Sequence, residues 1–439
     1  MTPGPSETGE PGEAFDSARF DRIYRNEVGR CTATLVRVLG DIDLAEDSVA
    51  EAFAVAARRW PDHGIPPNPG GWITTTARNR AIDHLRRESK RAERQLASHR
   101  QRLIEHDDES VATADLGDLG DLDVVPDDQL RLMFLCCHPA LAPDTQVALT
   151  LRLLAGLQTP EIARAFLVPE ATLAQRLVRA KRKIRDSNIS YRIPAAHQLA
   201  TRLQSVLATI YLVFTEGHTA TEGDSLTRSD LSGEAVRLAR LLSELLPDEE
   251  EPKGLLALLL LTEARREARV DAKGRLVRLG EQDRSRWDRV AIDEGHQLVR
   301  DCLRRNNPGP YQLQAAIAAV HGDAGTAAET DWRQIVMLYD HLQQLQPNAM
   351  VGLNRSIALA ELEGPELGLA ALEQLQSDLD RYHLFHATRA EFLGRLGAVA
   401  EAANAYDRAL ELVANEVERR HLRARRAALP VADRPGAPG

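Results

Sequence analysis

The feature that most constrains the fold is a pair of short amphipathic helices in residues 158–185, QTPEIARAFLVPEATLAQRLVRAKRKIR. Thr159 and Pro160 predict a helix start, because a threonine oxygen can cap backbone N–H groups and proline is tolerated in the first helical turn. The sequence Leu-Val-Pro at 167–169 interrupts the apolar pattern, and a second helix is expected to begin near Thr172. Six basic residues follow there, up to residue 185, with no acidic residue between them: Arg176, Arg179, Lys181, Arg182, Lys183 and Arg185.

Two interpretations fit this basic helix. It can be the second helix of a helix-turn-helix, which enters an anionic groove such as that of DNA. It can also be a helical hairpin with a solvated basic face. Capping, turn spacing, apolar register and charge agree on the first interpretation, in a chain whose formal net charge is −10.

Composition predicts an all-α protein. The chain has 439 residues, enough for two to four domains, with 43% hydrophobic and only 4% aromatic residues and helical periodicity throughout. The longest apolar run, Leu255–Leu261, is too short to span a bilayer, and residues 1–13 read as a flexible acidic tail rather than a signal peptide. We therefore expect a cytoplasmic protein that makes no membrane contact.

The four cysteines predict no disulfide and no metal site. Cys31, Cys136, Cys137 and Cys302 lack disulfide spacing, and the adjacent pair lacks the two-residue gap of a zinc motif. Buried packing is the expected role. No motif for a cofactor or a catalytic residue stands out.

An acidic stretch lies near the N-terminus. Residues 15–60 show two amphipathic helices, and the sequence GDIDLAEDSVAEAF between their apolar positions aligns carboxylates on one exposed face, Asp41, Asp43, Glu46, Asp47 and Glu51. An acidic helical face is usually no more than a solvated surface.

A Pro/Gly turn and a basic helix follow. The turn IPPNPGGW ends in Trp72, and the next helix, ITTTARNRAIDHLRRESKRAER, has many more basic than acidic residues. An aromatic ring beside a basic surface is typical of proteins that stack unpaired bases and hold phosphates. A tryptophan packed into the core under a solvated helix is an equally good interpretation of Trp72.

Two further segments of the sequence differ from these motifs, an acidic segment and a long C-terminal segment with an internal repeat. Residues 105–128 contain ten acidic residues and no Lys or Arg, which predicts a flexible linker. About half of the chain follows residue 187, and it contains an internal similarity between the segments that begin at Ala358 and Phe392, an offset of 392 − 358 = 34 residues. This offset is the tetratricopeptide period and predicts stacked helix pairs.

Together, GDIDLAEDSVAEAFAVAARRWP, PGGWITTTARNRAIDHLRRE and the later basic helix-turn-helix resemble bacterial RNA polymerase sigma factors of the extracytoplasmic-function class, in a subgroup with a C-terminal tetratricopeptide-like extension. The resemblance covers roughly residues 15–187. The expected segments are a disordered tail (1–13), sigma domain 2 (14–100), an acidic linker (101–126), sigma domain 4 (127–188), a helical-repeat extension (189–428) and a second tail (429–439).

The resemblance implies a transcription initiation factor without enzymatic activity, whose partners are core RNA polymerase and promoter DNA. A protein or peptide ligand of the repeats is a further candidate partner. It implies polymerase docking by Asp41, Glu46, Asp47 and Glu51. It implies contacts to the −10 element by Trp72, Arg78, Asn79, Arg80, Asp83, Arg86 and Arg87. It implies contacts to the −35 element by Thr172, Gln175, Arg176, Arg179, Arg182 and Lys183.

Two other functions remain open at this stage. One is a stand-alone helix-turn-helix regulator whose repeat domain senses a ligand or peptide. The other is a scaffold with a degenerate helix-turn-helix. A stand-alone regulator has no need of an acidic face followed by a basic helix headed by Trp72. The scaffold predicts that the protein shows no salt-dependent DNA binding.

Overall fold

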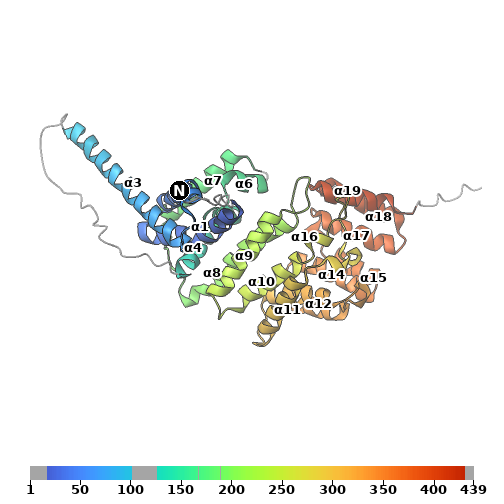
Figure 1. Ribbon diagram of the computed structural model, residues 1–439. Coiled ribbons are helices and arrows are strands. Elements are labelled where there is room, and N and C mark those ends of the chain that lie inside the picture. Colours follow the sequence, from blue (N-terminus) through green and yellow to red (C-terminus); the bar gives the residue numbers. More distant parts are fainter. Residues whose placement is uncertain (1–16, 101–125, 167, 188, 431–439) are drawn as a thin grey trace, which may run out of the picture. The chain divides into compact units, whose positions relative to one another are not determined.

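The computed structural model describes residues 17–100, 126–166, 168–187 and 189–430, which form nineteen α-helices and four short 3-10 helices with no β-strand in these ranges (Figure 1). The predicted all-α fold is confirmed. The predicted tail at 1–13 lies outside the described residues, as do nearly all of the predicted linker at 101–126 and of the tail at 429–439.

The chain divides into two compact units, Met1–Val206 and Leu207–Gly439. The described helices of the first unit are α1 (Ser17–Leu39), α2 (Ile42–His63), α3 (Pro69–Arg100), α4 (Pro126–Cys136), α5 (Pro143–Leu153), α6 (Thr159–Ala165) and α7 (Glu170–Asp186). Helix α8 (Ala196–His218) contains the division between the units.

Helices α1 to α3 pack around one aromatic core. Phe53, Trp60 and Ile73 are almost fully buried there, and the ring of Phe20 meets Trp60 edge to face at 5.7 Å. Gly40 separates α1 from α2 with a positive φ of 68°, a conformation that a side chain disfavours. The Asp41 carboxylate accepts from the backbone N–H of Leu44 and caps α2.

Helices α4 to α7 form a second bundle in the same unit. On α7 the buried side chains recur at helical spacing, at Leu173, Leu177, Ala180 and Ile184. These residues pack the helix against its neighbours, mainly α5 and α6. The predicted helix-turn-helix is thus present as α6 and α7.

Two local details differ from the sequence-based prediction. The residue that caps α6 is Gln158 rather than Thr159, because Gln158 and Glu161 form a reciprocal capping box that places Thr159 inside the helix. Helix α7 begins at Glu170, directly after Pro169, two residues earlier than expected. In addition, Asp127 and Asp128 lie in the first turn of α4 rather than in a flexible acidic tract.

The four cysteines are buried and reduced. Burial raises the pKa of the Cys136 thiol well above its ordinary value, so this thiol stays protonated. Within the described ranges no cluster of three His, Cys, Asp or Glu side chains could hold a metal ion.

The second unit continues with α9 (Ser229–Leu245), α10 (Glu250–Glu263), α11 (Arg289–Leu303), α12 (Pro310–Asp323), α13 (Trp332–Leu345), α14 (Ala349–Glu363), α15 (Pro365–Glu373), α16 (Gln376–Leu379), α17 (His383–Arg395), α18 (Val399–Leu412) and α19 (Glu416–Ala427). Short 3-10 helices lie at Arg266–Ala268, Leu279–Glu281, Arg284–Arg286 and Ala327–Glu329.

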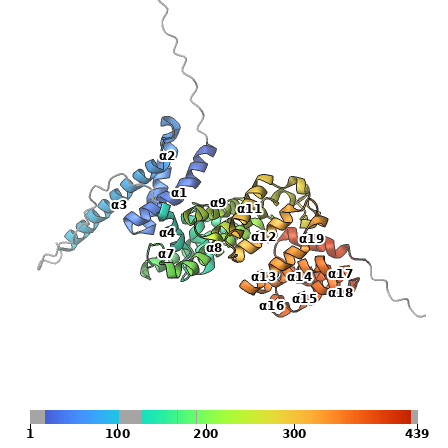
Figure 2. The ribbon, with the colours of Figure 1, turned by 90° about the horizontal axis from the view of Figure 1, so that it is seen from below.

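The sequence repeat corresponds to two helix hairpins, α14–α15 and α17–α18, which lie side by side (Figure 2). Ala358 and Phe392 occupy equivalent, buried positions in α14 and α17. Gly368 and Ala402, again 34 residues apart, are small because their helices cross closely. A Cβ atom on Gly368 would stand 2.4 Å from that of Ala360.

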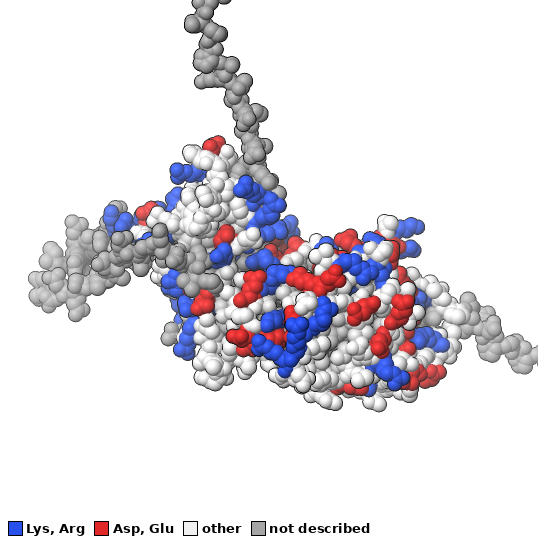
Figure 3. Space-filling model, turned by 60° about the horizontal axis from the view of Figure 1, so that its bottom comes forward, with Lys and Arg blue, Asp and Glu red and all other residues white. Residues whose placement is uncertain are grey.

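None of the helices in the described ranges combines the length and apolar character that a bilayer span requires. On the face of the molecule shown in Figure 3, acidic and basic side chains lie close to one another, among a larger area of uncharged residues.

Candidate nucleic-acid interface

Helix α7 presents an exposed polar face opposite its buried one. The predicted base- or phosphate-contacting residues on this face are Thr172, Gln175, Arg179, Arg182 and Lys183, and all five are exposed. Val178, which sequence reasoning did not single out, is 64% exposed beside them. The helix therefore carries amide, guanidinium, ammonium and apolar groups on one accessible side, the groups that read and hold duplex DNA.

Several basic residues of α7 already have partners within the protein. Arg176 is half-buried and lies 3.6 Å from the Asp144 carboxylate, while Arg182 and Asp186 form a pair one turn apart. Lys183 donates to the backbone carbonyl of Ala140. Exposed pairs of this kind are weak, so DNA phosphates could replace them at little cost.

Helix α3 carries the second basic surface. Its buried side chains include Ile73, Thr74, Ala77 and Ala81. Asn79, Asp83 and Arg86 are exposed, and their spacing of four and three residues places them in one row on the opposite face. Arg87 is exposed and Arg80 partly exposed beside this row, whereas Arg78 is partly buried on the other flank.

Trp72 satisfies parts of both sequence-based interpretations. Its ring meets the buried ring of Trp60 edge to face at 5.5 Å, so one side of the indole belongs to the core of the α1–α3 bundle. The residue is nevertheless partly exposed. A tryptophan held in this way has a fixed orientation and can still offer ring surface to a base.

The carboxylates of the predicted acidic face on α2 have different environments in the structure. Asp47 and Glu51 are exposed. Asp41 caps its own helix, as described above, which gives it a structural role. Glu46 is almost fully enclosed, because its side chain is only 14% exposed.

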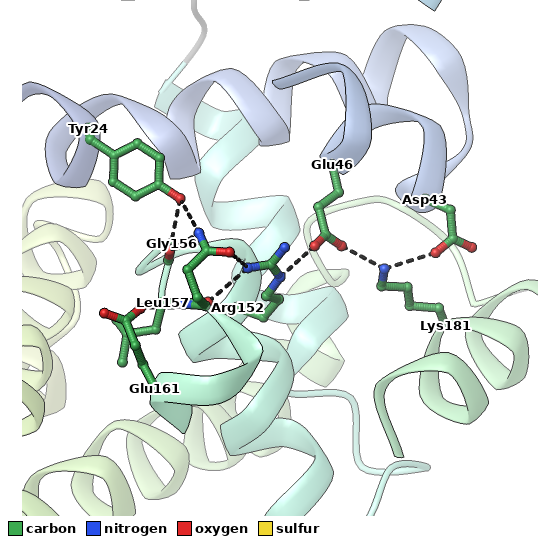
Figure 4. Close-up of polar contacts among 9 residues, drawn as sticks. Tyr24, Asp43, Glu46, Arg152, Gly156, Leu157, Glu161 and Lys181 are labelled. Atoms are coloured by element: carbon green, nitrogen blue, oxygen red, sulfur yellow. Dashed lines mark hydrogen bonds and ion pairs between the residues drawn. The ribbon is translucent and has the colours of Figure 1, made fainter. Parts of the chain in front are cut away.

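Glu46 is enclosed by basic residues from the α4–α7 bundle (Figure 4). Arg152 of α5 donates to Glu46 at 2.5 Å, and Lys181 of α7 donates to the other oxygen at 2.6 Å. Lys181 also donates to Asp43 at 2.8 Å. We call these four residues, Asp43, Glu46, Arg152 and Lys181, the closed contact.

The carboxylates of the closed contact affect the ionisation of Lys181, and Glu46 also affects that of Asp47. Burial opposes the charged form of Lys181, but the carboxylates of Glu46 and Asp43 outweigh it, so the pKa of Lys181 is raised. Partial burial, and then the neighbouring charge of Glu46, raises the pKa of Asp47. Lys181 is therefore held as a cation by its partners.

Sequence reasoning did not identify the pairing of Asp43 and Glu46 with Arg152 and Lys181. The residues lie 106 to 138 positions apart in the chain, and no local pattern connects them. The one available signal was that Lys181 stands off the row formed by Gln175, Arg179 and Arg182 on the helix.

Comparison with known proteins assigns three segments of the chain to families. Residues 23–91 match the family model for Sigma-70 region 2, and residues 131–184 match the model for Sigma-70, region 4. Residues 202–303 match a family of unknown function, DUF6596.

Two similar proteins add detail. An uncharacterized protein of Rhizobium meliloti is 42% identical over 408 residues, which cover 93% of this chain and 95% of that protein. The probable ECF RNA polymerase sigma factor SigI of Mycobacterium tuberculosis is 34% identical over 170 residues, 38% of this chain and 54% of SigI. The chain thus matches about half of SigI. The two matched regions, in this order, and the similarity to SigI show that the chain contains the region 2 and region 4 domains of sigma-70 proteins and is a homologue of ECF sigma factors.

Proposed function

We propose that the protein binds core RNA polymerase and directs it to promoters by recognising −10 and −35 elements. The observation that carries this proposal is the combination, in one chain, of region 2 with an exposed basic row on α3 and region 4 with an exposed recognition face on α7. A regulator that only binds duplex DNA needs the second surface but not the first.

The exposed carboxylates of α2 are the proposed docking residues for the polymerase. Asp47 and Glu51 are accessible, and Glu46 joins them once its intramolecular partners are released. Asp41 contributes by holding the start of α2 in place. Complementary charges speed and orient such an encounter more than they add to its final affinity.

Helix α3 is proposed to meet the −10 element. Asn79 and Asp83 have the hydrogen-bonding groups to contact a base edge, and Arg86, with Arg80, Arg87 and the flanking Arg78, supplies phosphate contacts. Trp72 offers a stacking surface for an unpaired base, worth about 1–3 kcal/mol per stacked base.

Helix α7 is proposed to enter the major groove of the −35 element. Thr172, Gln175 and Arg176 lie in its N-terminal half and are suited to read base edges, with Val178 available to a thymine methyl group. Arg179, Arg182 and Lys183 are suited to phosphates, which set register and salt dependence.

Other parts of the proposal follow from this role. The chain performs no chemical reaction itself, because the polymerase makes the RNA, and it works in the cytoplasm. Residues 14–100 and 127–188 serve as sigma domains 2 and 4 on either side of the acidic linker. The segment 189–428 modulates their activity through a protein or peptide held by its helical repeats.

The test is promoter-directed transcription in vitro with purified core polymerase. We expect specific initiation that depends on the protein, and a loss of at least about tenfold with Asp47→Arg, because reversing an exposed docking charge creates repulsion at the encounter. Asp62→Arg, on the last turn of α2, is the matched control. If the protein binds duplex DNA tightly but gives core polymerase no promoter specificity, a stand-alone regulator is the correct function.

A further inference from the structure

Three arginines without carboxylate partners lie near one another in the second unit. Arg265 and Arg269 flank the 3-10 helix that follows α10, and Arg284 begins a later 3-10 helix. We propose that they form a binding site for a small oxyanion, the carboxylate or phosphate group of a small molecule, and that Arg265 is the residue that binds it. The site belongs to the second unit alone, so the inference goes beyond the proposed sigma function and does not depend on it.

The guanidinium group of Arg265 is enclosed and has cations as neighbours. Burial, and then the positive charges of Arg269 and Arg284, lower the pKa of Arg265 to about 10. This value is still well above neutrality, so Arg265 remains charged. None of the three arginines forms an ion pair with a carboxylate in the part of the chain that the structure describes. An enclosed cation without a counterion is costly, and an anion that binds from outside removes this cost.

Two of the arginines are fixed in place by neutral acceptors. Arg269 donates to the backbone carbonyl of His218 and, at 2.8 Å, to the hydroxyl of Thr219. Arg284 donates to the backbone carbonyl of His321 at 2.8 Å. These bonds orient the two guanidinium groups but leave their charge uncompensated. The side chain of Arg265 makes no hydrogen bond within the described residues and is partly exposed, so its donors remain available to a ligand.

The carboxylates in the neighbourhood have other partners. Those that act on Arg269 or Arg284 at longer range are Glu263, Glu418 and Glu329. Glu263 accepts from Arg266 at 2.8 Å, and a Glu418 oxygen lies 3.3 Å from Nε2 of His383. Glu329 accepts from the backbone N–H of Thr326 and so caps its own 3-10 helix. The positive charge at Arg265 therefore has no counterpart among these groups.

Tyrosine side chains from three helices supply further donors beside Arg265. The rings of Tyr211 in α8 and Tyr311 in α12 meet edge to face at 5.7 Å. Burial, and then the nearby Tyr211, raise the pKa of Tyr339 in α13 to about 12, against the opposing charge of Arg265. All three residues are partly exposed, and their hydroxyls make no hydrogen bond within the described residues. Protonated hydroxyls next to an unpaired guanidinium are the donors that a carboxylate or phosphate accepts from.

The first and last helices of the second unit are joined, which favours a small ligand. Asn415, the N-cap of α19, is fully buried and donates to the carbonyls of Ala220 and Ser225, just after α8, at 3.0 and 2.9 Å. Thr219, a partner of Arg269, belongs to the same loop. The helical array is therefore closed on itself. An extended polypeptide is better suited to an open array, along which it can run past both ends.

The site is tested by calorimetric titration of the full-length protein with inorganic phosphate and with benzoate, at constant ionic strength. We expect one of the two probes to bind and Arg265→Gln to weaken its binding at least about tenfold, because the charged donor is lost. Arg333→Gln, which removes an exposed arginine of α13, is the matched control and should change nothing. The probe that binds identifies the ligand group as a phosphate or a carboxylate.

Two further measurements separate binding from a structural role of Arg265. Arg265→Gln should unfold at no lower temperature than the wild type without probe, because it removes repulsion from Arg269 and Arg284. Tyr339→Phe keeps the ring and removes only the hydroxyl, so it should weaken binding of the same probe about three- to tenfold. A clearly lower unfolding temperature for Arg265→Gln, or full affinity in Tyr339→Phe, contradicts the assigned role of that residue.

The result is independent of transcription. The titration contains neither polymerase nor DNA, so a failure of the sigma function leaves the anion site standing, and the reverse also holds. If neither phosphate nor benzoate binds to the wild type, or if Arg265→Gln binds both as the wild type does, the inference is wrong.

Discussion

Helices α3 and α7 carry similar numbers of basic residues, but these residues differ in whether they form ion pairs inside the protein. On α3, Arg78, Arg80, Arg86 and Arg87 form no recorded ion pair with an acidic side chain in the described part of the chain. On α7, Arg176, Lys181 and Arg182 all do. A count of basic residues therefore overstates how many side chains of α7 are without a partner inside the protein, whereas these four arginines of α3 have no acidic partner in the described part of the chain.

The largest change in stability is expected from replacing the buried carboxylate of Asp128, which links α4 to α1. Asp128→Asn removes the anion between Arg37 and Arg131, and we expect a loss of about 2–3 kcal/mol, somewhat below a fully buried pair because both guanidinium groups are partly exposed. Hydrogen exchange followed by mass spectrometry should show lower protection in α4 and the facing turns of α1. Asp127→Asn, an exposed neighbour, is the control, and unchanged protection would contradict the prediction.

Base reading by α7 is expected to give the next effect. Gln175→Ala should cost about 1–2 kcal/mol against the preferred −35 sequence and much less against others, because a bidentate amide contact discriminates between bases. Binding to a panel of duplexes that differ at single positions measures this. Arg182→Gln should instead weaken all duplexes alike, and a uniform loss with Gln175→Ala would show that Gln175 does not read bases.

The salt dependence of DNA binding should distinguish the exposed residues Arg86 and Arg179 from Lys181, which is paired inside the protein. Arg86→Gln should lower the slope of log affinity against log salt by about 0.7 for single-stranded −10 DNA, and Arg179→Gln should lower it by about 0.9 for −35 duplex, since each removes one phosphate contact. Lys181→Gln should leave the duplex slope nearly unchanged, because Lys181 is held by Glu46 and Asp43. Binding titrations at several salt concentrations measure these slopes. If Lys181→Gln lowers the duplex slope as much as Arg179→Gln does, Lys181 contacts a DNA phosphate.

The smallest expected effect concerns the ionisation of Lys181. Its pKa is raised above the ordinary 10.5, so its contribution to the closed contact is complete below pH 10.5 and is lost as the pH rises through the raised value. Competitive labelling of lysine amines with acetic anhydride should therefore find Lys181 severalfold less reactive than the exposed Lys90 of α3. Glu46→Gln should narrow this difference, and equal reactivity in the wild type would show that Lys181 is free.

Much of the fold was accessible from sequence because its signals are local. The apolar residues Leu173, Leu177 and Ile184 follow helical spacing, and the break at Pro169 marks the turn, so α6 and α7 could be predicted to within two residues. The 34-residue offset between Ala358 and Phe392 likewise predicted stacked helix pairs, and the structure has two equivalent hairpins there. The choice of Gln158 as the cap was missed, because Thr159 is the better N-cap by type and only the side-chain geometry distinguishes them.

The candidate site was only partly accessible. Exposure of Gln175, Arg179 and Asn79 follows from helix periodicity. The partial burial of Trp72 against Trp60 does not, because it depends on which helices meet. Sequence reasoning treated Asp41, Glu46, Asp47 and Glu51 as one exposed face, whereas the structure assigns them a helix cap, an enclosed ion-pair partner and two free carboxylates.

The sequence by itself determined an all-helical chain with two basic helices, one of them in a helix-turn-helix, and a resemblance to sigma factors carried by their order and spacing. Only the tertiary structure decided that Lys181 and Arg152 lie on Glu46 instead of in solvent. The physical reason is range. Helix periodicity, capping and charge runs involve residues only a few positions apart, so they can be recognised in a short stretch of sequence. Charges more than 100 residues apart are brought together only by the packing of the helices.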